Sequence, residues 1–196
     1  MANRRVLQRE DTRRRLYEAA LAVFRRDGVE GARIEDVVAQ VGVSRGSFYF
    51  HFPTKEDVLV LAYAHARERT EALIHAIPEA TPIAALLHAV VTDTAERWRE
   101  DPALFALVGM HALRSVAGTP LAAERDSLRQ LLAARFALVL ERGELVTPLP
   151  AELLADMFLL NTFTGLLAWS ANPGLPLGPV LEGVVHLFLS GVKPPG

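Results

Sequence analysis

The stretch RIEDVVAQVGVSRGSFYFHFPTK, residues 33–55, decides how the first part of this chain folds. Its apolar residues recur at helical spacing over about 34–41, which predicts a short amphipathic helix that ends at Gly42. Ser44 is a suitable N-cap for a second short helix, and Pro53 separates that helix from a third. Two short helices joined by a tight turn with a glycine are typical of the helix-turn-helix motif, whose second helix enters the major groove of DNA.

The second short helix carries side chains suited to contacts with bases and phosphates. Arg45 lies in its first turn, and a guanidinium matches the two major-groove acceptors of guanine. Ser47 can donate to a base or a phosphate, the Tyr49 hydroxyl can reach the backbone, and His51 and Lys55 can meet phosphates. Each of these residues alone is also consistent with ordinary surface or packing. Their combined spacing predicts a DNA-binding set: Arg33, Ser44, Arg45, Gly46, Ser47, Tyr49, His51 and Lys55.

Composition places the chain among globular proteins, because 51% of its 196 residues are apolar and 22% are charged. The absence of cysteine excludes disulfides and thiolate metal sites. Charge is unevenly distributed: residues 1–56 hold 11 Lys/Arg against 8 Asp/Glu, while the remainder hold 10 against 15. A basic end on an acidic protein is typical of local phosphate binding, although an ordinary solvated tail has the same composition.

The whole chain is predicted to be all-α, because helical periodicity recurs almost everywhere and strand signals are weak. A three-helix head, residues 1–53, with Phe48 and Phe52 in its core, precedes a helical ligand-binding and dimerisation bundle, residues 54–196. No Gly/Ser-rich linker separates the two, so the fourth helix is the expected connection. About nine helices are expected, over about 12–27, 34–41, 44–50, 55–76, 83–100, 102–116, 121–141, 151–171 and 179–190.

Residues 153–171 form a run long enough to span a bilayer, but Asp156, Asn161 and two threonines interrupt it. A buried helix is therefore predicted in place of a membrane span. The chain begins with charged residues and no apolar core, which does not resemble a secretory signal, and a cytoplasmic location is expected.

The last two expected helices are apolar most of the way round, and a helix of that kind must be buried on all sides. In a chain of this size that favours a homodimer, since a second copy can cover such faces. The alternative is a central core helix in a monomer. The predicted interface residues are Leu153, Met157, Leu160, Thr164, Leu167, Leu181, Val184, Val185 and Phe188.

Two segments resemble the N-terminal DNA-binding domain of the TetR family of bacterial transcriptional regulators: TRRRLYEAALAVFRRDGVEG and GVSRGSFYFHFPTKEDVL. The resemblance covers roughly residues 12–60. It rests on Phe24, Gly28, Gly42-Val43-Ser44, Gly46, Tyr49, His51-Phe52 and Lys55-Glu56. Ala32-Arg33 stand where the family often has a threonine cap, and valines stand at positions 38 and 41, where alanine is frequent.

This resemblance implies an Ω-shaped, all-helical homodimer whose last two helices pair with their mates in a four-helix bundle. The heads would bind a palindromic double-stranded operator, and the middle helices would enclose an effector pocket. Most such proteins are repressors that release DNA when a small molecule binds. The apolar middle helices suggest an apolar or amphipathic effector, lined by residues from the set Tyr63, His88, Trp98, Phe105, Met110, His111, Phe136, Phe158 and Asn161.

The sequence contains no motif for a metal site, a cofactor or catalysis. Five histidines, at positions 65, 75, 88, 111 and 186, show no helical pairing with one another, and no P-loop, Gly-x-Ser-x-Gly or HExxH is present. We therefore expect no metal, no cofactor and no enzymatic activity. The competing interpretation is a helical dimer that binds small molecules and no longer regulates through DNA; an enzyme would need a polar constellation that the sequence lacks.

Overall fold

The computed structural model describes residues 2–99, 101–116, 127–172 and 174–191. Within these ranges the backbone forms nine α-helices and no strand, which confirms the all-α prediction. The chain divides into two compact units, Met1–Tyr63 and Ala64–Gly196. The functional division expected after residue 53 stays a prediction.

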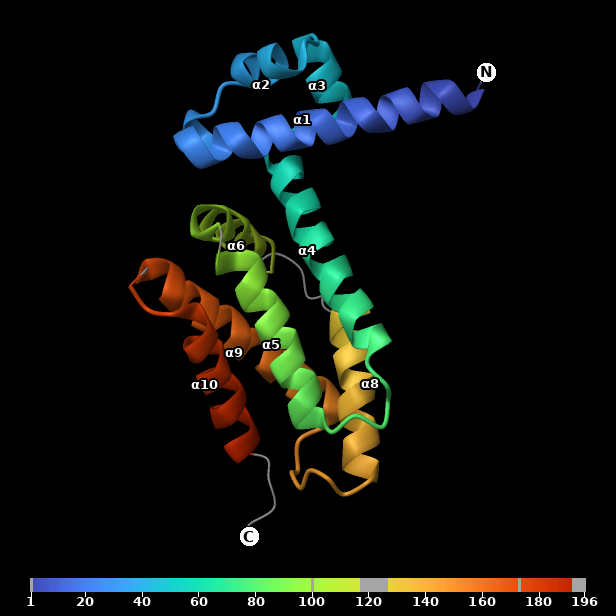
Figure 1. The fold of residues 1–196 in the computed structure, drawn as a ribbon, viewed down its shortest axis with the longest axis vertical. Coiled ribbons are helices and arrows are strands. Elements are labelled where there is room, and N and C mark those ends of the chain that lie inside the picture. Colours follow the sequence, from blue (N-terminus) through green and yellow to red (C-terminus); the bar gives the residue numbers. More distant parts are fainter. Residues whose placement is uncertain (1, 100, 117–126, 173, 192–196) are drawn as a thin grey trace. The chain divides into compact units, whose positions relative to one another are not determined.

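The first unit contains α1 (Ala2–Gly31), α2 (Ile34–Val41), α3 (Arg45–His51) and the beginning of α4 (Glu56–Ala76). Figure 1 shows α2 and α3 lying along α1, whose N-terminal turns extend past α3. The apolar faces of the helices meet in a core. Phe48 of α3 and Phe52, its C-cap, are buried in this core, as predicted. The most deeply buried side chains of this core include Leu16, Phe24, Val37, Phe48 and Phe52.

Helix α1 begins about ten residues earlier than its sequence suggests. Asp11 and Thr12, at the expected start, lie inside the helix: Thr12 Oγ1 donates to the Gln8 carbonyl at 2.9 Å, and Asp11 pairs with Arg14. Residues 2–10 contain neither glycine nor proline, so nothing local prevents the helix from continuing toward the N-terminus. At the other end Gly28 breaks the helix as expected, with φ 71° and ψ 166°.

The turn between α2 and α3 has the local structure that its residues favour. Gly42 is left-handed, with φ 78°, and its N–H donates to the Val38 carbonyl at 2.8 Å. Ser44 caps α3 by accepting from the Ser47 N–H at 3.2 Å, as predicted. The N-cap of α2 is Arg33, which makes no side-chain capping bond, so the threonine cap usual in the family is lost.

The second unit contains α5 (Ile83–Arg99), α6 (Pro102–Val116), α8 (Ser127–Glu141), α9 (Ala151–Ala171) and α10 (Leu177–Ser190). Helix α9 packs against α6, α8 and α10, and α10 also packs against α5. Positions 121–126 of the expected seventh helix lie outside the described residues. The most deeply buried side chains of this core include Leu86, Leu87, Leu132, Phe136, Leu154, Phe158, Leu181 and Val185.

Two arginines of the second unit bind backbone carbonyls near α4. Arg97 of α5 donates to the Ala66 carbonyl at 2.6 Å and to Thr70 Oγ1 at 3.2 Å, and it pairs with Asp93. Burial lowers the pKa of Arg97, and Asp93 offsets part of that effect. The buried Arg135 of α8 donates to the carbonyls of residues 77 and 78, just after α4. These bonds fix the C-terminal part of α4 in its unit.

Helix α9 is long and apolar enough to cross a membrane, but 39% of its most apolar window is buried against the other helices. Leu154, Phe158 and Leu166 lie on its buried face, whereas Leu153 and Leu160 are exposed on the other. The chain thus buries one face of α9. The prediction that this helix is covered on all sides is not met within one chain.

Candidate DNA-binding surface

Helix α3 separates its side chains into a buried and an exposed face. Phe48 is fully buried, while Arg45, Gly46 and Tyr49 are exposed and Ser47 is half-buried. The capping bond at Ser44 and the left-handed Gly42 set the start and direction of the helix. The exposed face therefore presents a guanidinium, a hydroxyl and a phenol on a short, rigid element, which is the arrangement that the sequence predicted.

Arg45 forms an ion pair with Glu35 of α2, with 2.6 Å between Nη1 and Oε1. Both side chains are more than half exposed, so water and salt screen the pair and its contribution to stability is small. The guanidinium can exchange this carboxylate for an acceptor on a base at little energetic cost. In this structure Glu35 holds the Arg45 side chain.

Lys55 is bound to the end of α1. Its Nζ donates to the Val29 carbonyl at 3.1 Å and to the Glu30 carbonyl at 3.4 Å. An ammonium has three donors, so one direction remains for a phosphate. Lys55 therefore connects the start of α4 to the segment that follows Gly28, a structural role that sequence reasoning missed because its partners lie 25 and 26 residues away.

His51 lies in the last turn of α3, near Arg9 and Arg13 of α1. Burial first, and then the charges of the two arginines, lower the pKa of His51 below its ordinary value of 6.5. Because the folded-state pKa is depressed, the stabilisation that the neutral ring provides is present above about pH 6.5 and is lost as the pH falls through the lowered value.

The residues expected to line an effector pocket are dispersed through the second unit and beyond. Trp98 and Phe105 stack edge to face at 5.4 Å, and Phe105 lies 6.1 Å from Phe163. Phe136 and Phe158 both pack on Phe188 in the core. Tyr63 and Asn161 are exposed, and the side chains of Met110 and His111 lie outside the described part of the chain.

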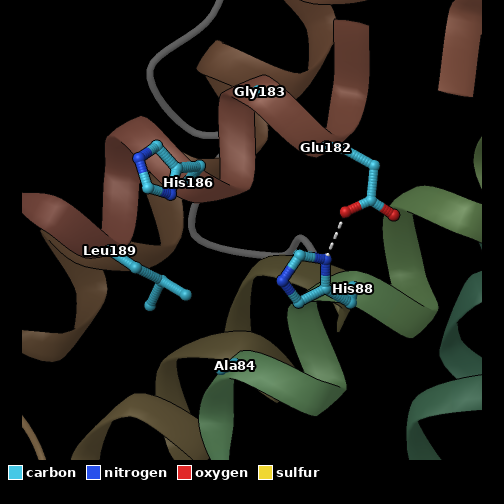
Figure 2. Close-up of a pocket in the computed structure, with 6 residues that line it drawn as sticks. All are labelled: Ala84, His88, Glu182, Gly183, His186 and Leu189. Carbon is cyan, nitrogen blue, oxygen red and sulfur yellow. Dashed lines mark ion pairs between the residues drawn. The ribbon is translucent and has the colours of Figure 1, made fainter. Parts of the chain in front are cut away.

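One expected residue, His88, lines a pocket of about 440 Å³ between α5 and α10. Figure 2 shows His88 and Glu182 pointing toward each other, and His88 Nδ1 lies 2.7 Å from Glu182 Oε2. His186 lies one turn further along α10 and also lines the pocket. Sequence reasoning missed Glu182 and His186, although two polar residues four apart in an otherwise apolar helix were a visible signal.

The residues expected at a dimer interface fall into two groups. Leu153, Met157, Leu160 and Thr164 are exposed on α9, and Leu167 and Val184 are half-buried. By contrast, Leu181, Val185 and Phe188 are buried in the core of their own chain, so they offer no surface to a second copy. The assignment of these three to the interface is corrected: α10 turns them toward α5 and α9.

Among the described residues, no group of three or more histidine, aspartate or glutamate side chains could hold a metal ion. The pair of His88 and Glu182 supplies only two ligands.

Residues 16–62, which contain α2, α3 and most of the α1 core, match the family model described as bacterial regulatory proteins, tetR family. The HTH-type transcriptional regulator SrpR of Pseudomonas putida is 37% identical over 71 residues, which are 36% of this chain and 33% of that protein. The chain spans between 33% and 53% of the length of the first curated relatives that it matches.

Two longer matches include the second unit. The regulator EthR of Mycobacterium tuberculosis is 25% identical over 173 residues, which are 81% of this chain and 76% of that protein. The crystal structure of FadR from Thermus thermophilus, described as a transcriptional repressor in complex with lauroyl-CoA, superposes with a TM-score of 0.68. It is 25% identical and covers 94% of this chain and 96% of its own. The motif and the helical architecture agree with these similarities: residues 16–62 are similar to bacterial regulatory proteins of the TetR family, and the longer part of the chain is similar to these two regulators.

Proposed function

We propose that the protein is a transcriptional regulator that binds double-stranded DNA through α3 and releases its operator when a small molecule binds the second unit. The observation that carries this proposal is the exposed face of α3, capped by Ser44 and presenting Arg45 and Tyr49 within the matched residues 16–62. A helix of this kind is suited to the major groove, where its first turn meets base edges. Selection of bound sites from a pool of random duplexes tests the proposal and yields the operator sequence.

Substitutions on α3 should separate base reading from backbone contact. We expect Arg45→Ala to weaken operator binding and relax base preference at one position, with a loss of about 1–3 kcal/mol, because a bidentate contact to guanine is removed. Tyr49→Ala and Lys55→Ala should weaken binding to all sequences alike, since phosphates carry no sequence information. Fluorescence anisotropy with the selected duplex and single-base variants measures both effects.

Arg142→Ala is the control for Arg45→Ala. Each side chain is exposed and pairs with one carboxylate, Glu35 for Arg45 and Glu144 for Arg142. Arg142 belongs to the second unit and lies outside α4, so its replacement should leave operator affinity unchanged. If Arg45→Ala, Tyr49→Ala and Lys55→Ala all bind the operator with wild-type affinity, α3 is not the helix that binds DNA.

A homodimer is part of this proposal. Exposed or half-buried residues of α9 recur at intervals of four and three, at Leu153, Met157, Leu160, Thr164 and Leu167. That spacing is the heptad pattern by which two helices pair along an apolar seam. Two heads related by two-fold symmetry would read two half-sites, which for adjacent major grooves lie about 34–36 Å apart, and the operator would be palindromic.

The effector is proposed to be amphipathic, with a long apolar part. The packed aromatic cluster of Trp98, Phe105 and Phe163 would give an apolar lining to a site in the second unit, and the repressor FadR from Thermus thermophilus was crystallised with lauroyl-CoA. We expect lauroyl-CoA to raise the melting temperature of the protein and to reduce operator binding. Ligand at about 100 times its Kd stabilises the folded state by roughly 2.7 kcal/mol. Coenzyme A without the acyl chain is the control, and identical effects of both compounds would contradict an apolar site.

Helix α4 is the element through which the effector would act. Its first residues belong to the first unit, and its later residues are bound to α5: Arg97 donates to the Ala66 carbonyl, and Arg69 of α4 pairs with Asp93. A ligand that prefers one position of α5 would shift these bonds and, through α4, the distance between the two heads of a dimer. The effector weakens DNA binding only to the extent that its affinity differs between the two states.

The competing proposal is a helical dimer that binds small molecules without regulating transcription. It predicts no salt-dependent binding to duplex DNA, whereas a regulator should lose affinity steeply as salt rises. Cytoplasmic location and the absence of enzymatic activity accompany the regulator proposal, as its relatives are transcriptional regulators.

A further inference from the structure

The N-terminal part of α1 contains more arginines than its own structure uses. Arg14 pairs with Asp11 at 2.6 Å and with Glu18 at 3.1 Å, so two carboxylates on the same helix neutralise it. Arg15 donates to the Val41 carbonyl at 2.9 Å and thereby caps the end of α2. Carboxylates therefore neutralise the charge of Arg14, and a backbone carbonyl holds the side chain of Arg15 in a structural role.

Arg9 and Arg13 lie one helical turn apart and turn toward α3. The guanidinium carbon of Arg9 is 4.8 Å from the centre of the Phe50 ring, and that of Arg13 is 5.6 Å from the centre of the Phe52 ring. Among the side chains that the structure describes, no carboxylate pairs with either of them. Stacking occupies the planar face of a guanidinium and leaves its N–H edge free to bind a phosphate.

Phe50 is the least expected feature of this region, since a large apolar ring next to the reading residues is 64% exposed. Its contacts explain it: Arg9 covers one side, and the His51 ring meets it edge to face at 5.2 Å. The ring holds Arg9 beside α3 and limits the conformations of a side chain that would otherwise be mobile. Because α1 begins at Ala2, Arg9 lies on regular helix and not on a flexible tail.

We infer that Arg9, Arg13 and His51 form a second phosphate-binding site for duplex DNA, built by the N-terminal turns of α1 against the end of α3. This inference rests on the proposed function and extends it, because it assigns DNA contacts to α1, outside the helix-turn-helix. The two stacked guanidinium groups bind phosphate oxygens next to the bases that α3 reads. His51 completes the site as a hydrogen-bond donor, and a bound phosphate counteracts the two positive charges that lower its pKa.

The site makes a quantitative claim about salt dependence. Each neutralised phosphate contributes about 0.9 to the slope of log affinity against log salt. The double variant Arg9→Ala/Arg13→Ala should therefore lower the slope by about 1.8 for each bound head, or about 3.6 for a dimer on both half-sites. It should weaken binding to every sequence by a similar factor and leave base preference unchanged. The probe is a labelled duplex of about three helical turns, roughly 30 base pairs, titrated between about 50 and 200 mM salt.

Two controls keep folding and bulk charge apart from phosphate binding. The double variant Arg9→Lys/Arg13→Lys retains the charge and should keep most of the slope. Arg14→Ala removes an arginine that is also exposed, at 60%, but already paired with carboxylates, and it should leave the slope near the wild-type value. Melting curves show whether each variant is folded.

The outcomes separate this inference from the function on which it rests. If the wild type binds duplex with a steep salt slope and the alanine double variant has the same slope, the α1 site is wrong and the regulator proposal stands. If Arg14→Ala lowers the slope by about half as much as the double variant does, every arginine near the N-terminus contributes charge alike. The proposed site is then likewise wrong. If the wild type shows no salt-dependent binding, both proposals fail.

Discussion

Phe48→Ala is expected to unfold the first unit under conditions in which the wild type remains folded. The Phe48 ring is fully buried, and it packs against Phe52 with 5.7 Å between ring centres. Replacing a buried phenylalanine by alanine typically lowers the free energy of unfolding by about 3–5 kcal/mol. Apolar contacts are lost, and the cavity that remains is filled only in part by the surrounding side chains. A whole domain is stable by only about 5–15 kcal/mol, so most of the margin of a unit this small disappears.

Phe50→Ala is the matched control for this variant, since it removes the same side chain from the same helix at an exposed position. Surface substitutions usually change stability by about 0.5 kcal/mol or less. Thermal denaturation followed by circular dichroism should show an early transition for Phe48→Ala, and no such transition for Phe50→Ala. Equal stability of the two variants would mean that α3 does not pack as described.

Leu160→Asp is expected to convert the proposed dimer into monomers. Leu160 is 63% exposed at the middle of the α9 stripe, between Met157 and Thr164. In a paired seam its replacement would bury a carboxylate without a partner, which costs several kcal/mol, and each 1.4 kcal/mol raises the dimer Kd about tenfold. Operator affinity should fall with it, because a monomer engages only one half-site.

Val146→Asp is the control, because Val146 is a similarly exposed apolar residue, at 60%, in the loop before α9 and not on the stripe. Sedimentation velocity should give a dimer for the wild type and for Val146→Asp, and a monomer for Leu160→Asp. A wild-type monomer at micromolar concentration, or a Leu160→Asp protein that still sediments as a dimer, would exclude the α9 seam.

The local features of the head were accessible from the sequence because each depends on residues close together in the chain. Apolar spacing over positions 34–41 marked α2, Gly42 supplied the left-handed turn, and Ser44 supplied the cap that α3 uses. The loss of a side-chain cap at Arg33 was predictable for the same reason. These are contacts between near neighbours, and their geometry follows from helix pitch and capping chemistry.

The roles of the charged side chains were not accessible in this way. Six arginines in residues 1–15 looked like one basic end, but the folded unit gives Arg14 two carboxylates, Arg15 a carbonyl of α2, and Arg9 an aromatic ring of α3. Lys55 likewise binds carbonyls 25 and 26 residues away. A long flexible side chain takes the partner that the fold places within reach, and sequence spacing does not specify that partner.

The apolar helices at the end of the chain show the same division. Their composition was enough to predict that α9 and α10 are core helices, but it does not say which neighbour covers which face. Packing against α5, α6 and α8 decides that Leu181, Val185 and Phe188 belong to the chain's own core and that Leu153 and Leu160 remain exposed. Hydrophobic periodicity indicates how much apolar surface a helix must bury. Which neighbouring helix covers that surface depends on packing between segments that are distant in sequence.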